Sequence, residues 1–322
     1  MNSTEFTAGL ADAAEFGALA ERYRRELHVH CYRMLGSFDE AEDLLQETFF
    51  RGWRARNSFQ GQASPRAWMY RIATNACLDF LRRNPRKAHV KRSGEGSEFV
   101  EVAWIQPYPD TLLDEVSPSE AEPDVVVVKR ESIELAFLTA IQLLPPRQRA
   151  VLLLCDVLDW SAAEVAAWLE TSVASINSAL QRARATLEQR RASPLSDPTE
   201  QQRALLQRYM DATNRSDIEA FVGLVHEDVL NTMPPEPEFI YGHAGMRQAL
   251  EEAFDTQRFG EWRCVETWVN RQPAAACYLR KPGESEFRLF GLDVLRIEHG
   301  TVVEVTSFIG HSFAGFGLPS VL

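Results

Sequence analysis

The sequence SPRAWMYRIATNACLDFLRR, residues 64–83, decides the first part of the fold. Ser64 is a good helix cap, and Pro65 suits the first turn of a helix, where its missing N–H has no partner to lose. One face of the expected helix is apolar and another is polar, at steps of three and four: Trp68, Ile72, Ala76 and Phe80 against Arg71, Asn75, Asp79 and Arg82. The stretch therefore predicts a helix with two distinct faces.

The polar face of this helix has the chemistry of a nucleic-acid contact. Arg and Asn donate hydrogen bonds to phosphates and base edges. Trp68 and Tyr70 are aromatic side chains of the kind that stack on unpaired bases, at ~1–3 kcal/mol per base. An alternative places Trp68 in the protein core, and the sequence does not decide between the two.

A second helix is expected immediately before this one. Ser37–Glu40 matches a capping box and predicts a helix start, after which apolar residues recur at helical spacing (Ala41, Leu45, Phe49 and Trp53). The opposite arc is polar and mostly acidic: Asp39, Glu42, Asp43, Gln46 and Glu47. It is either a solvated face or a surface for a protein partner.

Charge is distributed unevenly along the 322 residues, whose formal net charge is −12. Residues 16–92 contain 15 Lys and Arg against 8 Asp and Glu, whereas residues 93–130 contain 2 against 9 and residues 193–322 contain 11 against 19. One basic module is thus embedded in an acidic chain. Such a module can bind the phosphates of nucleic acid. The acidic parts can then contact a protein partner, or they can occupy the DNA-binding surface of the module when no DNA is bound.

Helical periodicity returns over residues 129–192. One helix opens at Leu144–Arg149, Ser161–Glu164 is a second capping box, and Ser172 can cap a third helix. In that third helix the residues expected to face inward are Val173, Ile176, Leu180, Ala183 and Leu187, and those facing outward are Ser175, Asn177, Ser178, Gln181, Arg182 and Arg184. The pattern predicts a helix-turn-helix, with a plain helical bundle as the alternative.

Residues 24–37, 41–49 and 67–79 closely resemble region two of sigma-70-family factors of the extracytoplasmic-function group, and residues 144–187 resemble region four. The resemblance implies that the acidic arc (Asp39, Glu42, Asp43, Gln46 and Glu47) binds the beta-prime clamp helices of core RNA polymerase. The resemblance to region four implies that residues 144–187 contact the beta flap of core RNA polymerase. Both modules then hold promoter DNA.

The same resemblance assigns the two promoter elements. The −10 element would be recognised and melted by the helix that contains Trp68, Tyr70, Arg71, Asn75, Asp79, Arg82 and Arg83. The −35 element would be contacted by the outward residues of the recognition helix, Ser175, Asn177, Ser178, Gln181, Arg182 and Arg184. Many members of the group have Gly in the helix-turn-helix turn where this chain has Glu170. The turn either avoids a left-handed residue or is strained there.

The segment 93–128 is predicted to be an acidic, flexible linker, because Gly, Pro, Ser and acidic residues make regular structure there improbable. About 35 extended residues span on the order of 100 Å, enough for promoter elements that lie ~70 Å apart. The apolar Trp104, Ile105 and Tyr108 either lie in a basic polymerase channel or pack between domains.

Residues 199–317 resemble the SnoaL-like, ketosteroid-isomerase-like α+β fold, which forms a conical pocket. Two helices are expected over about 200–214 and 217–225, and four strands over 264–270, 274–280, 287–298 and 302–309. The likeness rests on 228–235, Tyr241-Gly242 and a helix from Gly245. Candidate pocket residues are Asp211, His226, His243, Trp262, Asp293 and Phe308, each with a structural or surface role as the alternative.

Several classes of protein are not supported by the sequence. The five cysteines form no C-x-x-C pair, so neither a zinc site nor a disulfide framework is expected. No cofactor, metal or catalytic residue is assigned. Apolar runs are far shorter than the ~20 residues that cross a bilayer, and no signal pattern begins the chain, so we expect a cytoplasmic protein without membrane insertion.

The sequence therefore predicts a multidomain sigma factor, not an enzyme: all-α region two and region four modules followed by an α+β SnoaL-like domain, shaped like a cone, that controls initiation in cis. One alternative is an isomerase, cyclase or hydrolase of the SnoaL-like kind with a DNA-binding regulatory half. Another is a helix-turn-helix regulator that acts without polymerase. The promoter, the inducing signal, a pocket ligand and an anti-sigma protein stay open.

Overall fold

The chain forms two compact units that interleave along the sequence. The computed structural model describes residues 12–59, 61, 64–85, 89–92, 99–102, 105–114, 133–188, 200–234, 239–311, 313 and 315–322. The first unit comprises residues 1–87 and 112–192, and the second comprises 88–111 and 193–322. The domain boundaries predicted at 93, 129, 193 and 199 lie outside the described residues.

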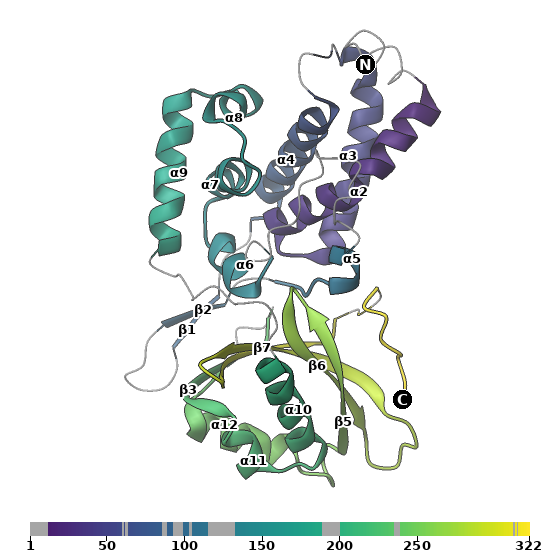
Figure 1. Ribbon diagram of the computed structural model, residues 1–322, viewed down its shortest axis with the longest axis vertical. Coiled ribbons are helices and arrows are strands. Elements are labelled where there is room, and N and C mark those ends of the chain that lie inside the picture. Colours follow the sequence, from purple (N-terminus) through teal and green to yellow (C-terminus); the bar gives the residue numbers. More distant parts are fainter. Residues whose placement is uncertain are drawn as a thin grey trace. The chain divides into compact units, whose positions relative to one another are not determined.

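Among the described residues of the first unit, all the regular elements are helices (Figure 1). Its first group of long helices packs together and contains α2 (Ala13–Leu35), α3 (Phe38–Ala55) and α4 (Pro65–Arg83). Its second group contains α6 (Leu135–Gln142), α7 (Pro146–Leu152), a π-helical turn (Leu153–Val157), α8 (Ala162–Trp168) and α9 (Val173–Glu188). The all-α modules predicted from the sequence are confirmed.

The helix starts follow the predicted caps. The Ser64 hydroxyl accepts from the Ala67 amide at 3.1 Å, and Pro65 is the first helical residue of α4. At α8 both halves of the capping box are present between Ser161 and Glu164. These bonds satisfy amides that a helix start would otherwise leave without a partner.

Two of the four residues in the expected buried stripe of α3 are buried. Ala41 and Leu45 are inaccessible to solvent, whereas Phe49 and Trp53 keep part of their surface. The Trp53 ring contacts the edge of Phe16, at 5.5 Å between centroids, because α2 covers the end of α3 there. The aromatic residues at this end therefore form a partly open flank of the core.

The second unit is built on one mixed sheet of six strands in the order β4-β3-β8-β7-β6-β5. The strands are β3 (Val225–Thr232), β4 (Phe239–Tyr241), β5 (Glu261–Val269), β6 (Gln272–Arg280), β7 (Arg288–Glu298) and β8 (Thr301–Ile309). The four predicted strands correspond to β5–β8, and the His299–Gly300 turn has positive φ at both residues. Strands β3 and β4 were not predicted.

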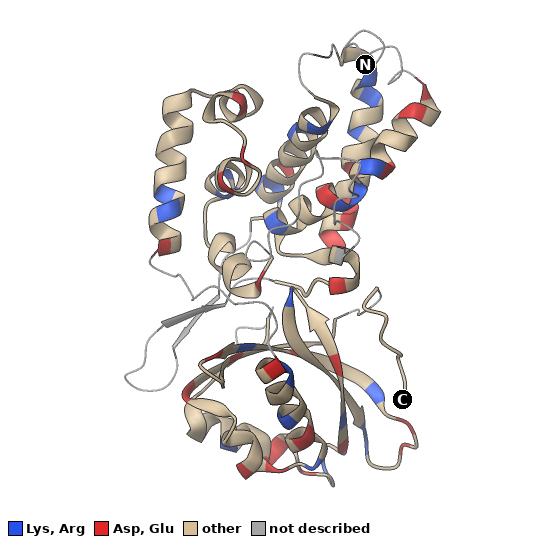
Figure 2. Cartoon of the chain, in the orientation of Figure 1, with Lys and Arg blue, Asp and Glu red and all other residues tan. Residues whose placement is uncertain are grey.

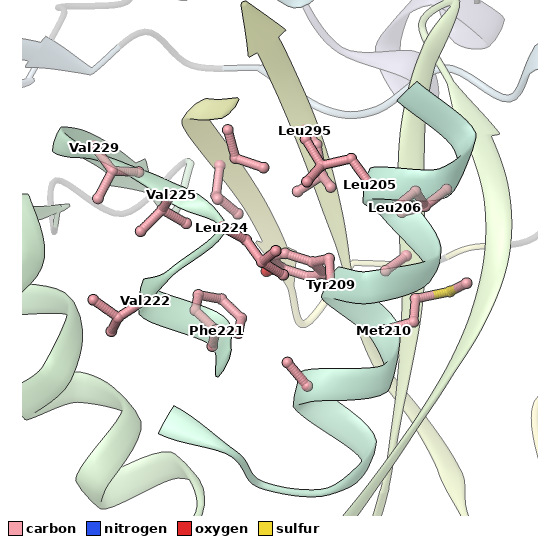
Figure 3. Packing of buried hydrophobic residues seen from close by; sticks show 14 of the residues in the cluster. Leu205, Leu206, Tyr209, Met210, Phe221, Val222, Leu224, Val225, Val229 and Leu295 are labelled. Carbon is pink, nitrogen blue, oxygen red and sulfur yellow. The ribbon is translucent and has the colours of Figure 1, made fainter. Parts of the chain in front are cut away.

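Helices α10 (Glu200–Asn214), α11 (Ile218–Val222) and α12 (Gly242–Ala253) pack against one face of this sheet. Figure 3 shows their buried contact, with Tyr209 extending from α10 into the middle of the cluster. Leu206 and Leu295 are inaccessible to solvent there. The predicted α+β domain is thus confirmed.

The linker contains regular structure that the sequence did not predict. Strand β2 (Phe99–Val102) and helix α5 (Asp110–Asp114) lie within it, and β2 pairs with β1 (His89–Arg92). Backbone pairing and contacts with the second unit supply the partners that a free tether would lack. No helix among the described residues has the length and apolar character needed to cross a bilayer.

Candidate functional site

The polar face of α4 is largely accessible. Arg71, Arg82 and Arg83 are exposed, and Asn75 and Asp79 are half-buried. Figure 2 shows Lys and Arg residues along α4 and near the end of α9. Asp79 accepts from Arg51 of α3 at 3.1 Å and from Arg82 at 3.0 Å, so it fixes α4 against α3 as well as bordering the basic face.

The two aromatic residues predicted on α4 are in different environments. Trp68 is half-buried against Phe59, at 5.2 Å between ring centroids. Tyr70 is only 1% exposed and donates its hydroxyl to Glu26 at 3.1 Å. Burial raises the pKa of Glu26, against the opposing effect of its ion pair with Arg66 at 2.9 Å.

The acidic arc of α3 is accessible at Asp39, Asp43 and Gln46. Its other two members are half-buried and paired: Glu42 lies 3.4 Å from Arg24, and Glu47 lies 2.7 Å from Arg51. Phe50 is 55% exposed at the same arc, three and four residues after Glu47 and Gln46. Phe50 was not predicted, although its position in the helical period places it outside the stripe formed by Ala41, Leu45, Phe49 and Trp53.

Helix α9 presents all six residues that were predicted to face outward to solvent: Ser175, Asn177, Ser178, Gln181, Arg182 and Arg184. Arg184 is held by Asp156 in a two-pronged ion pair, at 2.9 and 2.6 Å. One inward prediction is wrong, because Val173 is 44% exposed. Val173 is the first residue of the helix, beside the Ser172 cap, and α9 meets the core only from Ile176 onward.

The turn before α9 has a strained residue. Glu170 has a φ of 51°, which is the left-handed region where a side chain is disfavoured. The sequence had left open whether the turn avoids this conformation, and it does not. The Glu170 carboxylate lies 3.9 Å from Arg71, but both side chains are exposed, so this pair contributes at most about 1 kcal/mol.

The two helical groups of the first unit are packed together. Arg149 of α7 is only 4% exposed and donates to the backbone oxygen of Met34 at the end of α2 and to those of Ile141 and Leu144. The Trp160 ring meets the Tyr70 ring edge-on at 4.8 Å. Part of α4 is therefore covered by the group of helices α6–α9 in this arrangement.

Residues 105–111, here called the docked segment, are bound to the β5–β6 turn of the same compact unit. The Tyr108 amide donates to the Asn270 side-chain oxygen at 2.8 Å, and the Asn270 amide donates to the Tyr108 carbonyl at 3.0 Å. Asp110 accepts from the Arg271 amide at 2.8 Å, and Pro109 forms a bridge with Val269. Of the residues predicted to line a polymerase channel or pack between domains, Ile105 and Tyr108 are buried; Trp104 lies outside the described residues.

A cavity of about 290 Å³ lies inside the α+β domain. Asp293 borders it and accepts hydrogen bonds from Ser307 at 2.7 Å, Tyr209 at 3.0 Å and Cys277 at 3.5 Å. Asn231 in turn donates to Ser307 at 2.9 Å. Burial raises the pKa of Asp293, and the three donors oppose that rise.

Two of the six predicted pocket residues, Trp262 and Asp293, line this cavity. The other four do not, which corrects the prediction: Asp211 and His226 are exposed, His243 is bonded to the Val225 carbonyl, and Phe308 faces away. Phe308 lies between Ser307 and Ile309, which both line the cavity, and alternate residues of a strand point to opposite faces.

Five polar residues of the cavity wall were missed: Tyr209, Thr213, Asn231, Cys277 and Ser307. One signal was present in the sequence, since Asp293 stands between the apolar residues Leu292 and Val294. Finding Ser307 required the register, in which it is paired with Asp293. The described residues contain no cluster that could hold a metal ion.

Three family models match the chain. Sigma-70 region 2 matches residues 19–87, Sigma-70 region 4 matches residues 134–187, and a SnoaL-like domain matches residues 206–305. The first two matches contain α4 and α9, and the third contains most of the residues that line the cavity.

Relatives with a similar organisation are found in Mycobacterium tuberculosis. The chain is 42% identical over 321 residues to the ECF RNA polymerase sigma factor SigG, covering 96% of this chain and 85% of SigG. It is 31% identical over 221 residues to the ECF RNA polymerase sigma factor SigJ, covering 69% of this chain and 64% of SigJ. The crystal structure of SigJ matches the fold with a TM-score of 0.61 at 22% identity, over 92% of this chain and 96% of that one.

Proposed function

Because the chain belongs to the extracytoplasmic-function (ECF) RNA polymerase sigma factors, we propose which of its surfaces carry out the steps of initiation. The chain binds core RNA polymerase and directs promoter-specific transcription initiation. The residue roles below, the control by the SnoaL-like domain and the cytoplasmic location are our proposals.

We assign polymerase binding to the accessible arc of α3. Asp39, Asp43 and Gln46 are exposed, and the exposed Phe50 supplies an apolar anchor beside them. Glu42 and Glu47 complete the acidic surface while bound to Arg24 and Arg51. An aromatic residue next to charges is typical of a contact surface whose centre becomes desolvated on binding.

We assign promoter binding to α4 and α9. On α4 the −10 element is contacted by Arg71, Arg82 and Arg83, together with Asn75, Asp79 and Trp68, and by Tyr70 once the helix-turn-helix group has moved off it. On α9 the −35 element is contacted by Ser175, Asn177, Ser178, Gln181 and Arg182, and by Arg184 in exchange for Asp156.

Arg182→Ala tests the assignment of α9. We expect weaker promoter binding by the holoenzyme and, if Arg182 contacts a phosphate, a slope of log affinity against log salt that is smaller by about one. Arg208→Ala on α10 is the matched control, because Arg208 is also an exposed helical arginine. Equal effects of the two substitutions would contradict the assignment.

The docked segment carries the proposed control in cis. A channel of the polymerase is one of the places that the sequence leaves open for this linker, and the same residues are bonded to Asn270 and Arg271 of the α+β domain. One segment cannot occupy both places. Docking therefore withholds the linker from polymerase, and undocking is required for full activity.

The substitution Asn270→Gly tests whether release of the docked segment from the α+β domain increases initiation. Glycine accepts the φ of 54° at Asn270 without strain, but it removes the side-chain oxygen that binds the Tyr108 amide. Leaving that buried amide without its partner costs about 1–3 kcal/mol, so the segment undocks more readily. We expect faster proteolysis within 105–111 and more initiation in a reconstituted assay.

The matched variant is His299→Gly, which likewise replaces a residue of positive φ, here 50°, by glycine in the neighbouring β7–β8 turn. If Asn270→Gly speeds proteolysis of the docked segment but leaves initiation unchanged, the proposed regulation by the α+β domain is refuted. Unchanged initiation by a chain truncated after Arg191 would also refute it.

A second function, catalysis in the α+β domain, is favoured by one observation: Asp293 is a carboxylate in a largely apolar cavity. A general base of this kind needs a free lone pair and a raised pKa. Burial raises the pKa of Asp293, but three donors oppose that rise and hold the carboxylate in place, which favours binding over turnover. We therefore propose a ligand-binding domain and not an enzyme.

A further inference from the structure

The polar side chains in the wall of the α+β cavity have already used their hydrogens. Tyr209 and Ser307 donate to Asp293, and Cys277 does so more weakly. The two amide hydrogens of Asn231 go to Ser307 and to the Val305 carbonyl. None of these groups has a hydrogen left for a ligand without breaking an existing bond.

The same is true of the remaining polar side chains that line the cavity. The Thr213 hydroxyl donates to the Tyr209 carbonyl at 3.0 Å, and the Trp262 ring nitrogen donates to the Ala253 carbonyl at 2.7 Å. Among the described residues, the side chains that line the cavity therefore offer a ligand acceptors and not donors.

Asp293 is the main acceptor that is left. A carboxylate has about four lone-pair positions, and its three donors occupy three of them. The hydroxyl oxygen of Tyr209 also keeps lone pairs, since it is used here only as a donor. A ligand hydroxyl can bond to one of these oxygens while every existing hydrogen bond remains in place.

The charge and size of the wall restrict the ligand further. Among the described residues that line the cavity, none is Lys, Arg or His, so nothing compensates a ligand anion. Most of the wall is apolar, including Phe221, Phe254, Phe259 and Phe290. An engineered cavity of roughly 150 Å³ holds benzene, and this one, at about 290 Å³, is nearly twice as large.

We infer that the cavity is a binding site for an uncharged, mostly apolar molecule about the size of two fused rings, which donates one hydroxyl hydrogen to Asp293. A cationic amine fits less well, because the three donors already compensate Asp293 and the ammonium ion would lose its own hydration. The inference concerns binding alone. It holds whether or not the domain controls initiation, so its failure and that of the proposed function are distinguishable.

Four probes of one shape test this inference by calorimetry with the full-length chain: a naphthol, its methyl ether, a naphthoate and a naphthylmethylammonium ion. We expect the naphthol to bind at least about tenfold more tightly than the ether, which cannot donate a hydrogen bond. The naphthoate and the ammonium ion are expected to bind more weakly than the naphthol.

Two substitutions locate the site. Asp293→Asn should reduce the preference for the naphthol over the ether to within about threefold, since it replaces the carboxylate by a group that donates as well as accepts. Ala249→Leu narrows the wall at α12 and should weaken the naphthol at least about tenfold even if Asp293→Asn does not fold. Asp211→Asn, on the exposed side of α10, is the control and should change nothing.

The inference is overturned by any of four results: no naphthol binding at millimolar concentration, equal binding of naphthol and ether, tighter binding of either charged probe, or unchanged naphthol binding by Ala249→Leu.

Discussion

Glu170 shows how one residue can be strained within an otherwise regular turn. With a φ of 51°, a residue that has a Cβ atom is less stable by roughly 1–2 kcal/mol than in a right-handed conformation. Glycine avoids that strain but loses about 0.5–1 kcal/mol of backbone entropy on folding. We therefore expect Glu170→Gly to stabilise the helix-turn-helix group by about 0.5–1 kcal/mol.

The measurement is hydrogen exchange of the α8 and α9 amides. Glu170→Ala is the matched control, because it removes the same carboxylate near Arg71 and keeps the Cβ atom. Slower exchange in the glycine variant than in the alanine variant supports strain at this residue. Equal exchange rates in the glycine and alanine variants would contradict backbone strain at residue 170.

Single residues also mark the limit of what the sequence predicts. The six outward residues of α9 were predicted correctly, since a helix start and a period of 3.6 are enough to define a face. Asp293 was among the predicted pocket residues, and it lines the cavity. Phe308 was misplaced, because the neighbouring strands and their register decide which face of a strand borders the cavity.

At the scale of an element, α2 contains two buried histidines that are stable only when neutral. Burial lowers the pKa of His30 to about 3 and that of His28 to about 4. A histidine that binds a proton in the unfolded chain at pH 6.5 but not in the folded one makes folding less favourable as pH falls. The stability that each contributes is complete above pH ~6.5 and is lost as the pH falls toward the folded value.

We expect His30→Gln to flatten this pH dependence. Between pH 7.5 and 5 the free energy of unfolding of the first unit should fall less steeply than in the unsubstituted chain, by up to about 1.4 kcal/mol per pH unit. Thr74→Val is the control: it breaks the 2.9 Å contact between His30 and Thr74 but leaves the histidine able to titrate. Urea unfolding at several pH values measures both, and equal slopes for His30→Gln and the unsubstituted chain would contradict the prediction.

Elements differ in how well their sequences predict them. Helices α3, α4, α8 and α9 have capping residues and a regular period, and each was expected where it lies. Strand β3 was missed because His226, Glu227 and Asp228 are consecutive exposed polar residues, and its pairing with β8 shifts register between Val225 and Leu230. A bulged strand loses the alternation by which strands are recognised.

At the scale of the whole molecule, the order of domains was predictable but the pairing of segments was not. The linker is acidic and rich in Pro and Gly, which is typical of a flexible tether. Its docked segment is nevertheless part of the second compact unit, held by Asn270 and Arg271 more than 150 residues later in the chain. Contacts at such a separation depend on a complementary surface that local patterns do not encode.

The packing within the first unit has a consequence for initiation. Tyr70 and Met34 of the region two helices contact Trp160 and Arg149 of the region four helices. Promoter elements ~70 Å apart cannot be held by two modules in direct contact. We therefore expect the two groups to separate on the promoter, where the bond from Arg149 to Met34 and the edge-on contact between Trp160 and Tyr70 would open.

Initiation in a purified system tests the central claim most directly. Core RNA polymerase is combined with the full-length chain and genomic DNA, and the 5′ ends of the transcripts are mapped. We expect starts at defined positions, each preceded at a fixed distance by two shared sequence elements, and none of these starts with core enzyme alone. The same scattered starts with and without the chain, also when it carries Asn270→Gly, would contradict the account.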